Sequence, residues 1–211
     1  MIKLGDILNE IGEGVTPFPW KRRGVVKLEN WINDMATKDK ADHNYETLPV
    51  LEFEFKGEVA TYVAKIGGNF NRHVTISFGA KKPGTPKPFD WNVYVAASFD
   101  VIGSDKEVLT NYGEQFKVIS TVSDIVIKTI NELIEYEWLK VQEIILQPKL
   151  EDGEEGKPIT QSKRGRLYLA YIKKQGSKLK GNWTAAIEKD QFVIKNGTMS
   201  SPTNPDKYIN L

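Results

Sequence analysis

Apolar and polar residues alternate along much of the first half of the chain, which is the period of a strand that buries one face. The clearest run is residues 50–56, where Leu51, Phe53 and Phe55 share one face and the glutamates between them share the other. Further runs occupy residues 59–66, 73–78 and 92–101. Because the connections between successive runs are short, we expect these four strands to pair as an antiparallel meander.

Turn-forming residues separate the runs. Gly57 follows the first, and Gly67-Gly68-Asn69 stands between the second and the third, so we expect a tight turn at each place. Three prolines within residues 81–88 interrupt strand pairing before the fourth run.

Within residues 114–136 the apolar period lengthens to that of a helix. Asn111 and Glu114 have the spacing of a capping box, in which the asparagine caps the helix and the glutamate returns to the cap. We therefore expect a long amphipathic helix that covers the sheet. Its apolar stripe consists of Phe116, Ile119, Val122, Val126, Ile130, Leu133 and Ile134.

The second half of the chain predicts a strand, a helix and a hairpin. The strand covers residues 141–147, the helix residues 160–175, and the hairpin strands residues 183–187 and 191–195. Together the elements predict an α+β fold: a mainly antiparallel sheet covered by two helices, with an N-terminal helix and an extended C-terminal arm.

The pattern divides the chain into three parts. Residues 1–49 hold an N-terminal docking helix and an extended connection, residues 50–196 form a single α+β core domain, and residues 197–211 form a flexible C-terminal arm. Both ends are more apolar than a frayed terminus requires, so we expect them to contact neighbouring subunits; the alternatives are docking on the same domain and simple fraying. The expected assembly contacts are Ile7, Leu8, Ile11, Tyr208, Ile209 and Leu211.

The charge balance removes any whole-molecule attraction to nucleic acid or to an anionic membrane, because 29 basic and 28 acidic side chains give a formal charge of +1. The chain has no cysteine, which excludes disulfides and thiolate nucleophiles. No stretch approaches the roughly 20 apolar residues that span a bilayer, so we expect no membrane partner.

The candidate catalytic groups do not make a complete set. His73-Val74-Thr75 has the form of one half of a two-histidine phosphoesterase site, but His43 lacks the hydroxyl residue two positions later that would make the other half. Two histidines also make a histidine-rich metal site a poor fit. The sequence predicts no catalytic residue, no metal site and no cofactor.

A basic region over residues 163–180 is the candidate binding surface, because its cations are interleaved with aromatic residues that can stack on bases. This pattern is compatible with a contact with nucleic acid. The alternative is a solvated helix face with Leu167, Ala170 and Tyr171 turned inward. The candidate binding residues are Arg164, Arg166, Tyr168, Lys173 and Lys174.

The order of strands, long helix, strand, helix and closing strands resembles the core of acetyltransferases of the GNAT superfamily. There, a glycine-rich turn begins the long helix, and its amides hold the coenzyme A pyrophosphate. At that place this chain has a single glycine, Gly113, followed by Glu114, whose charge opposes a pyrophosphate. The resemblance also implies that Arg166-Leu167-Tyr168 lies on the helix after the fifth strand, where an aromatic residue often faces the acyl group.

Four segments of the chain look like uncharacterised tailed-bacteriophage proteins of crAss-like and other marine or gut phages; they are residues 4–11, 110–113, 116–122 and 166–172. This resemblance implies a phage origin. Together with the incomplete catalytic set and the two separable termini, it predicts a non-enzymatic virion component, structural or packaged, whose partners are other virion proteins or copies of itself. The alternative is a host-acting phage protein in the infected cytoplasm. That protein would be either a GNAT-like acyltransferase or a regulator that binds nucleic acid or protein.

Overall fold

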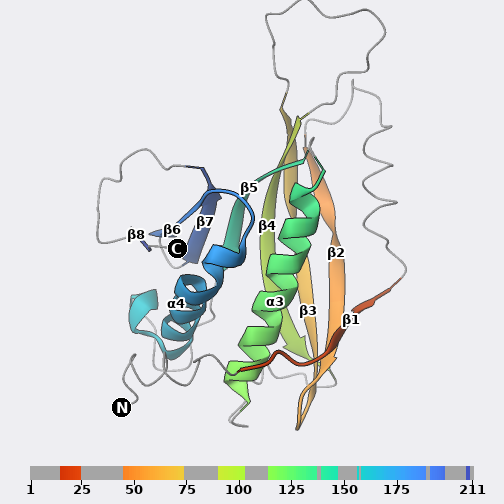
Figure 1. The fold of residues 1–211 in the computed structure, drawn as a ribbon, viewed down its shortest axis with the longest axis vertical. Helices are drawn as coiled ribbons and strands as arrows, with labels where there is room; N and C mark the ends of the chain where they lie inside the picture. Colours follow the sequence, from red (N-terminus) through yellow and green to blue (C-terminus); the bar gives the residue numbers. More distant parts are fainter. Residues whose placement is uncertain are drawn as a thin grey trace, which may run out of the picture.

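The computed structural model describes residues 15–24, 45–73, 90–102, 114–136, 139–146, 156, 158–188, 191–197 and 208–209. Within these residues, eight strands form one sheet in the order β1-β2-β3-β4-β5-β7-β6-β8, and the helices α3 and α4 pack against it (Figure 1). The strands are β1 (Trp20–Arg23), β2 (Tyr45–Lys56), β3 (Thr61–His73), β4 (Asp90–Val101), β5 (Leu139–Leu146), β6 (Trp183–Glu188), β7 (Gln191–Asn196) and β8 (Tyr208–Ile209). The helices are α3 (Gln115–Ile134) and α4 (Lys163–Gln175), with short 3-10 helices at Ile159–Gln161 and Gly176–Lys178.

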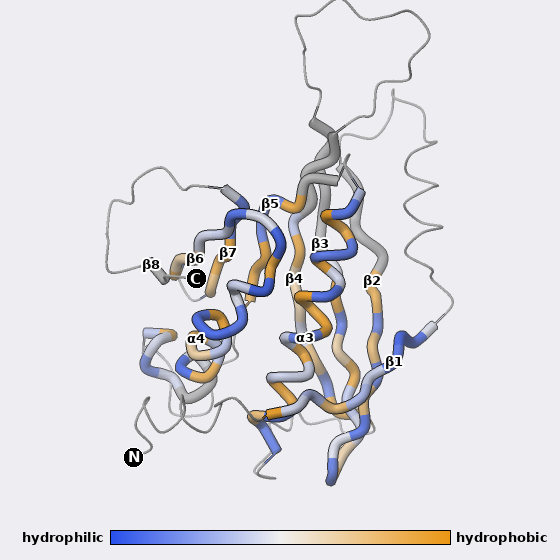
Figure 2. The backbone as a smooth tube through the Cα atoms, viewed as in Figure 1, coloured by the Kyte–Doolittle hydropathy of each residue, from blue (hydrophilic) through white to orange (hydrophobic). Residues whose placement is uncertain are grey.

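The predicted fold class is confirmed, since this is an α+β fold with a mainly antiparallel sheet and two covering helices. Among the strand pairs of the described sheet, β4 with β5 is the parallel one, and α3 is the crossover between them. Apolar and polar residues alternate along the strands and α3, as Figure 2 shows. Leu51, Phe53 and Phe55 are buried together as predicted, beneath α3.

The turn predicted at residues 67–69 is wrong. Strand β3 runs through these residues and pairs with β2 on one side and β4 on the other. The irregularity lies in β2, where the register shifts between Leu48 and Leu51. Pro49 has no N–H for the ladder, and the bulge leaves it unpaired opposite Gly67. His73 ends β3, and the rest of the strand predicted over residues 73–78 lies outside the described residues.

Helix α3 begins where the periodicity predicts, but the predicted capping box is wrong. Glu114 occupies the N-cap and makes no side-chain bond to its own helix. Its buried carboxylate instead accepts hydrogen bonds from the Glu58 N–H (2.6 Å) and the Tyr62 hydroxyl (2.7 Å). A side chain at Gly57 would collide with this carboxylate, at 2.6 Å from one oxygen. Glu114 therefore joins the β2–β3 turn to the start of α3; Asn111 lies outside the described residues.

The strap segment, residues 15–24, brings part of the predicted N-terminal connection into the fold. Its strand β1 pairs with β2, and the residues before β1 cross α3 (Figure 1). The Phe18 N–H donates to Thr121 Oγ1 (2.9 Å), and the Trp20 indole donates to Asp124 Oδ2 (2.8 Å). Apolar burial of Phe18 and these bonds explain why the sheet extends N-terminal to residue 50.

The C-terminal arm also contributes to the sheet, because β8 pairs with β6 through Ala185↔Ile209 and Ala186↔Tyr208. Tyr208 and Ile209, predicted as assembly contacts, thus lie beside a strand of their own chain. Strand β2 similarly begins at Tyr45, five residues before the predicted core. The remaining predicted assembly contacts, Ile7, Leu8, Ile11 and Leu211, lie outside the described residues.

Candidate functional site

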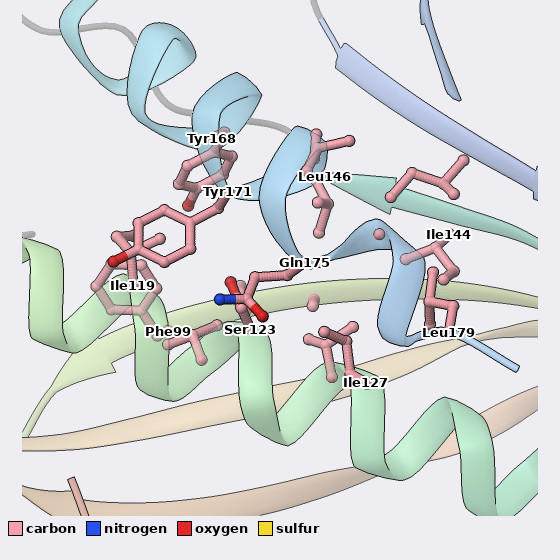
Figure 3. A pocket seen from close by; sticks show the side chains of 17 residues that line it. Phe99, Ile119, Ser123, Ile127, Ile144, Leu146, Tyr168, Tyr171, Gln175 and Leu179 are labelled. Atoms are coloured by element: carbon pink, nitrogen blue, oxygen red, sulfur yellow. The ribbon is translucent and has the colours of Figure 1, made fainter. Parts of the chain in front are cut away.

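A cavity lies between α3 and α4, above β4, β5 and β7 (Figure 3). It contains about 670 Å³ of space free of protein atoms, part of which is open solvent at its mouth. Its lining is mostly aliphatic and aromatic, and none of the described residues that line it is charged. The lining residues used below are Ala97, Phe99, Ile119, Ser123, Ile127, Ile144, Leu146, Tyr168, Tyr171, Gln175, Leu179 and Ile194.

The cavity lies over the carboxyl ends of the two parallel strands. The β4–β5 register, which shifts between Val93 and Tyr94, ends at the pair Ala96↔Ile145. Beyond that pair β4 continues to Val101, while Leu146 of β5 pairs with Phe192 of β7. The β4–β5 pairing therefore ends close to the end of β5, and β4 extends further beneath the cavity.

Hydrogen bonds connect α3 to α4 at one end of the cavity and to the segment that follows α4 at the other end. At one end the Tyr171 hydroxyl of α4 donates to the Phe116 carbonyl of α3 (2.5 Å). At the other end Asn131 of α3 donates to the Lys178 carbonyl (3.0 Å) and accepts from the Lys180 N–H (2.8 Å). These hydrogen bonds within the chain fix the two ends of the cavity, so the cavity is part of the fold.

The start of α4 is held by a tight backbone contact. Ser162 caps the helix by accepting from the Gly165 N–H (2.9 Å), and its hydroxyl donates to the Ile159 carbonyl (2.8 Å). A Cβ on Gly165 would lie 1.7 Å from that carbonyl oxygen. Only glycine fits here, and this contact sets where α4 enters over the sheet.

The cavity has an aromatic end, a polar middle and an aliphatic far end. Phe99, Ile119, Tyr168 and Tyr171 gather at one end and also pack together. Ser123 of α3 and Gln175 of α4 both point into the middle (Figure 3), and the far end is aliphatic. Burial raises the pKa of Tyr171 to about 12, so at neutral pH its hydroxyl is a neutral donor.

The structure divides the binding residues predicted on α4. Tyr168 lines the cavity, whereas Lys173 is exposed and Lys174 is half-exposed. Arg166 is half-buried, and its Nε has no hydrogen-bond partner among the described residues. Arg164 lies in the first turn of α4, and its side chain is outside the described part of the structure.

Two aromatic residues near the basic region are buried. Tyr171 is 3% exposed, and Trp183 is 7% exposed with its indole N–H donating to the Lys180 carbonyl. Their rings are therefore not displayed for stacking on bases. The inward alternative for α4 is confirmed for Leu167, Ala170 and Tyr171, which are buried.

Sequence reasoning did not identify the cavity or its polar centre. One signal was present: Ser123 interrupts the row formed by Ile119 and Ile127, which lie one turn away on either side. Phe99 and Gln175 carry no such signal, because their meeting depends on how α3, α4 and β4 are arranged.

None of the helices in the described part of the chain combines the length and apolar character needed to cross a bilayer. Within the same residues, no three histidine or carboxylate side chains are placed to share a metal ion. Comparison of the chain with family models, curated proteins and solved structures finds no significant match.

Proposed function

We propose that this protein binds an acyl-coenzyme A thioester in the cavity between α3 and α4. The observation that carries the proposal is the parallel pair β4–β5, each strand followed by a helix, with an apolar cavity over the carboxyl ends of the two strands. Ligands of sheets with parallel strands bind at the carboxyl ends of those strands. Ala97, Phe99 and Leu146 of these ends line the cavity.

The GNAT-like interpretation of the sequence supports the same ligand. It puts a pyrophosphate at the start of the long helix and an aromatic residue of the following helix against the acyl group. Tyr168 lines the cavity, and Tyr171, one turn further along α4, is bonded to Phe116 in the first turn of α3. The start of α3 and the aromatic residues of α4 therefore lie at the same end of the cavity.

The start of α3 is also suited to an anion. Its first turn contains no acidic side chain and includes Lys117, and the free N–H groups of a helix start attract phosphates. The sequence suggested that Glu114 would oppose this contact. Its carboxylate is directed to the β2–β3 turn, where it accepts hydrogen bonds from the Glu58 N–H and the Tyr62 hydroxyl.

Isothermal titration calorimetry of the purified chain with acetyl-, hexanoyl- and octanoyl-coenzyme A tests the proposal. We expect saturable binding of at least one thioester at one molecule per chain. A thiol-reactive dye in the same samples measures whether the thioester is also cleaved. Absence of binding heat with all three thioesters overturns the proposal.

A matched pair of substitutions on β4 tests the location. Ala97→Phe fills the cavity from below, whereas Ala96→Phe adds the same ring on the exposed opposite face of the strand. We expect Ala97→Phe to weaken binding at least tenfold and Ala96→Phe to leave it unchanged, with melting temperature checked for both. Equal effects of the two substitutions would place the ligand elsewhere.

The virion role inferred from the phage-like segments stays a prediction, as does its location in the particle. Mass spectrometry of gradient-purified particles, which counts copies of this chain per major capsid subunit, tests it. A fixed copy number supports a structural component, and absence supports the host-acting alternative, with which thioester binding agrees.

A further inference from the structure

The cavity is longer and more aliphatic than an acetyl group requires. Ile119, Ser123 and Ile127 line it from three successive turns of α3, a length of about 12 Å along the helix axis. If the coenzyme enters beside Ile119, a two-carbon acyl group would leave the turn that carries Ile127 uncovered. Atoms lining an unfilled apolar cavity lose contacts, so a ligand that fills the cavity is favoured over one that does not.

The order of groups along the cavity gives the bound molecule a direction. The aromatic end lies beside the start of α3, because Tyr171 there is bonded to Phe116. The polar pair Ser123 and Gln175 follows, and beyond it lies the aliphatic end with Ile127, Ile144 and Leu179. Ile194, which also lines the cavity, is the cross-strand partner of Ile144. A buried carbonyl needs a hydrogen-bond donor, and the pair in the middle offers a hydroxyl and an amide.

We infer that the thioester carbonyl lies at Ser123 and Gln175 and that the aliphatic end holds a medium-length, unbranched acyl chain. This inference rests on the proposed function and adds the class of acyl group. Ile144, Leu179 and Ile194 are at most 7% exposed, so a chain that reaches them leaves water. The absence of charged side chains among the described lining residues matches an uncharged tail.

The test compares the thioesters that differ only in chain length. Burying each additional methylene can tighten binding by up to about fourfold. We expect octanoyl-coenzyme A to bind at least tenfold more tightly than acetyl-coenzyme A in calorimetric titrations, with hexanoyl-coenzyme A between them. This comparison uses the unaltered chain, so it does not depend on whether a variant folds.

Two substitutions on α3 locate the chain. Ile127→Phe narrows the aliphatic end, whereas Ile134→Phe makes the same change at a half-buried isoleucine of the same helix that does not line the cavity. We expect Ile127→Phe to weaken octanoyl-coenzyme A binding at least tenfold and acetyl-coenzyme A binding less than twofold. Ile134→Phe should change neither.

The possible failures are distinguishable. If acetyl- and octanoyl-coenzyme A bind with equal affinity, the acyl-chain inference is overturned while the proposed function stands. If Ile127→Phe weakens both thioesters equally, the chain does not occupy the aliphatic end. If none of the thioesters binds, the proposed function falls and this inference falls with it.

Discussion

The two flanks of α3 are closed in different ways. On one flank the strap segment donates hydrogen bonds to α3 and packs its aromatic rings on β2. Phe18 stacks on Phe55 at 6.2 Å between ring centroids, and Trp20 meets Phe53 edge-on at 5.4 Å. On the other flank α4 bonds to α3 at one end of the cavity, the segment after α4 bonds to it at the other end, and the cavity lies between these connections.

This difference indicates where the fold has room for a ligand. Protein interiors are close-packed, and an unfilled apolar cavity costs stability. The strap flank follows that rule with a nine-tenths buried Phe18, whereas the cavity flank departs from it. Departures of this kind concentrate at functional sites, which is why the cavity flank is the one to test for binding.

Removing one aromatic ring from each flank should cost more stability on the strap flank than on the cavity flank. Phe18→Ala should lower the free energy of unfolding by about 4 kcal/mol, because it leaves a void beneath Phe55 and Lys117. Phe99→Ala, which removes a half-buried ring already beside a cavity, should cost about 2 kcal/mol. Urea unfolding of both variants measures the difference, and equal costs would contradict the contrast between the flanks.

A single methyl group should disturb the cavity flank. Alanine normally stabilises a helix by about 1 kcal/mol relative to glycine. At Gly165 the added Cβ meets the Ile159 carbonyl, so Gly165→Ala should instead cost about 3 kcal/mol and weaken thioester binding. Lys173→Ala, at an exposed position of the same helix, is the control and should stay within about 0.5 kcal/mol of the parent. A neutral Gly165→Ala would show that α4 can shift freely.

High pH should loosen the connection between the helices. Burial raises the pKa of Tyr171 to about 12 in the folded chain, above its ordinary value of about 10 when unfolded. Folding thus favours the neutral hydroxyl; its stabilisation is complete below pH 10 and is lost as pH rises through 12, by about 2 to 3 kcal/mol. Urea unfolding of the parent and of Tyr171→Phe at pH 9 and 11.5 measures it. A parent that loses no more stability than the variant would refute the assignment.

One substitution in the cavity should raise stability slightly and weaken ligand binding. Ser123→Leu fills the middle of the cavity and replaces serine with a better helix former, so it should raise the free energy of unfolding by about 1 kcal/mol. The same change removes a proposed donor for the thioester carbonyl and should weaken binding at least tenfold. A variant that is more stable and still binds the thioester fully would show that the thioester does not bind in the middle of the cavity.

Local periodicity determined much of the fold. The burial of Leu51, Phe53 and Phe55 and the long helix over residues 114–136 follow from spacing alone, since strand and helix periods fix which side chains share a face. The turn expected at residues 67–69 failed because pairing on both sides of β3 outweighed the local turn preference.

The composition of the candidate site depends on the tertiary structure. The sequence marked Tyr168 as a binding residue within a basic surface, but α4 turns it into a cavity with Phe99 and Ser123. Glu114 had the spacing of a cap, yet its carboxylate bonds to Glu58 and Tyr62, more than 50 positions away in the chain. Contacts between residues so distant in sequence depend on how strands and helices are placed, and no local pattern of side chains contains that information.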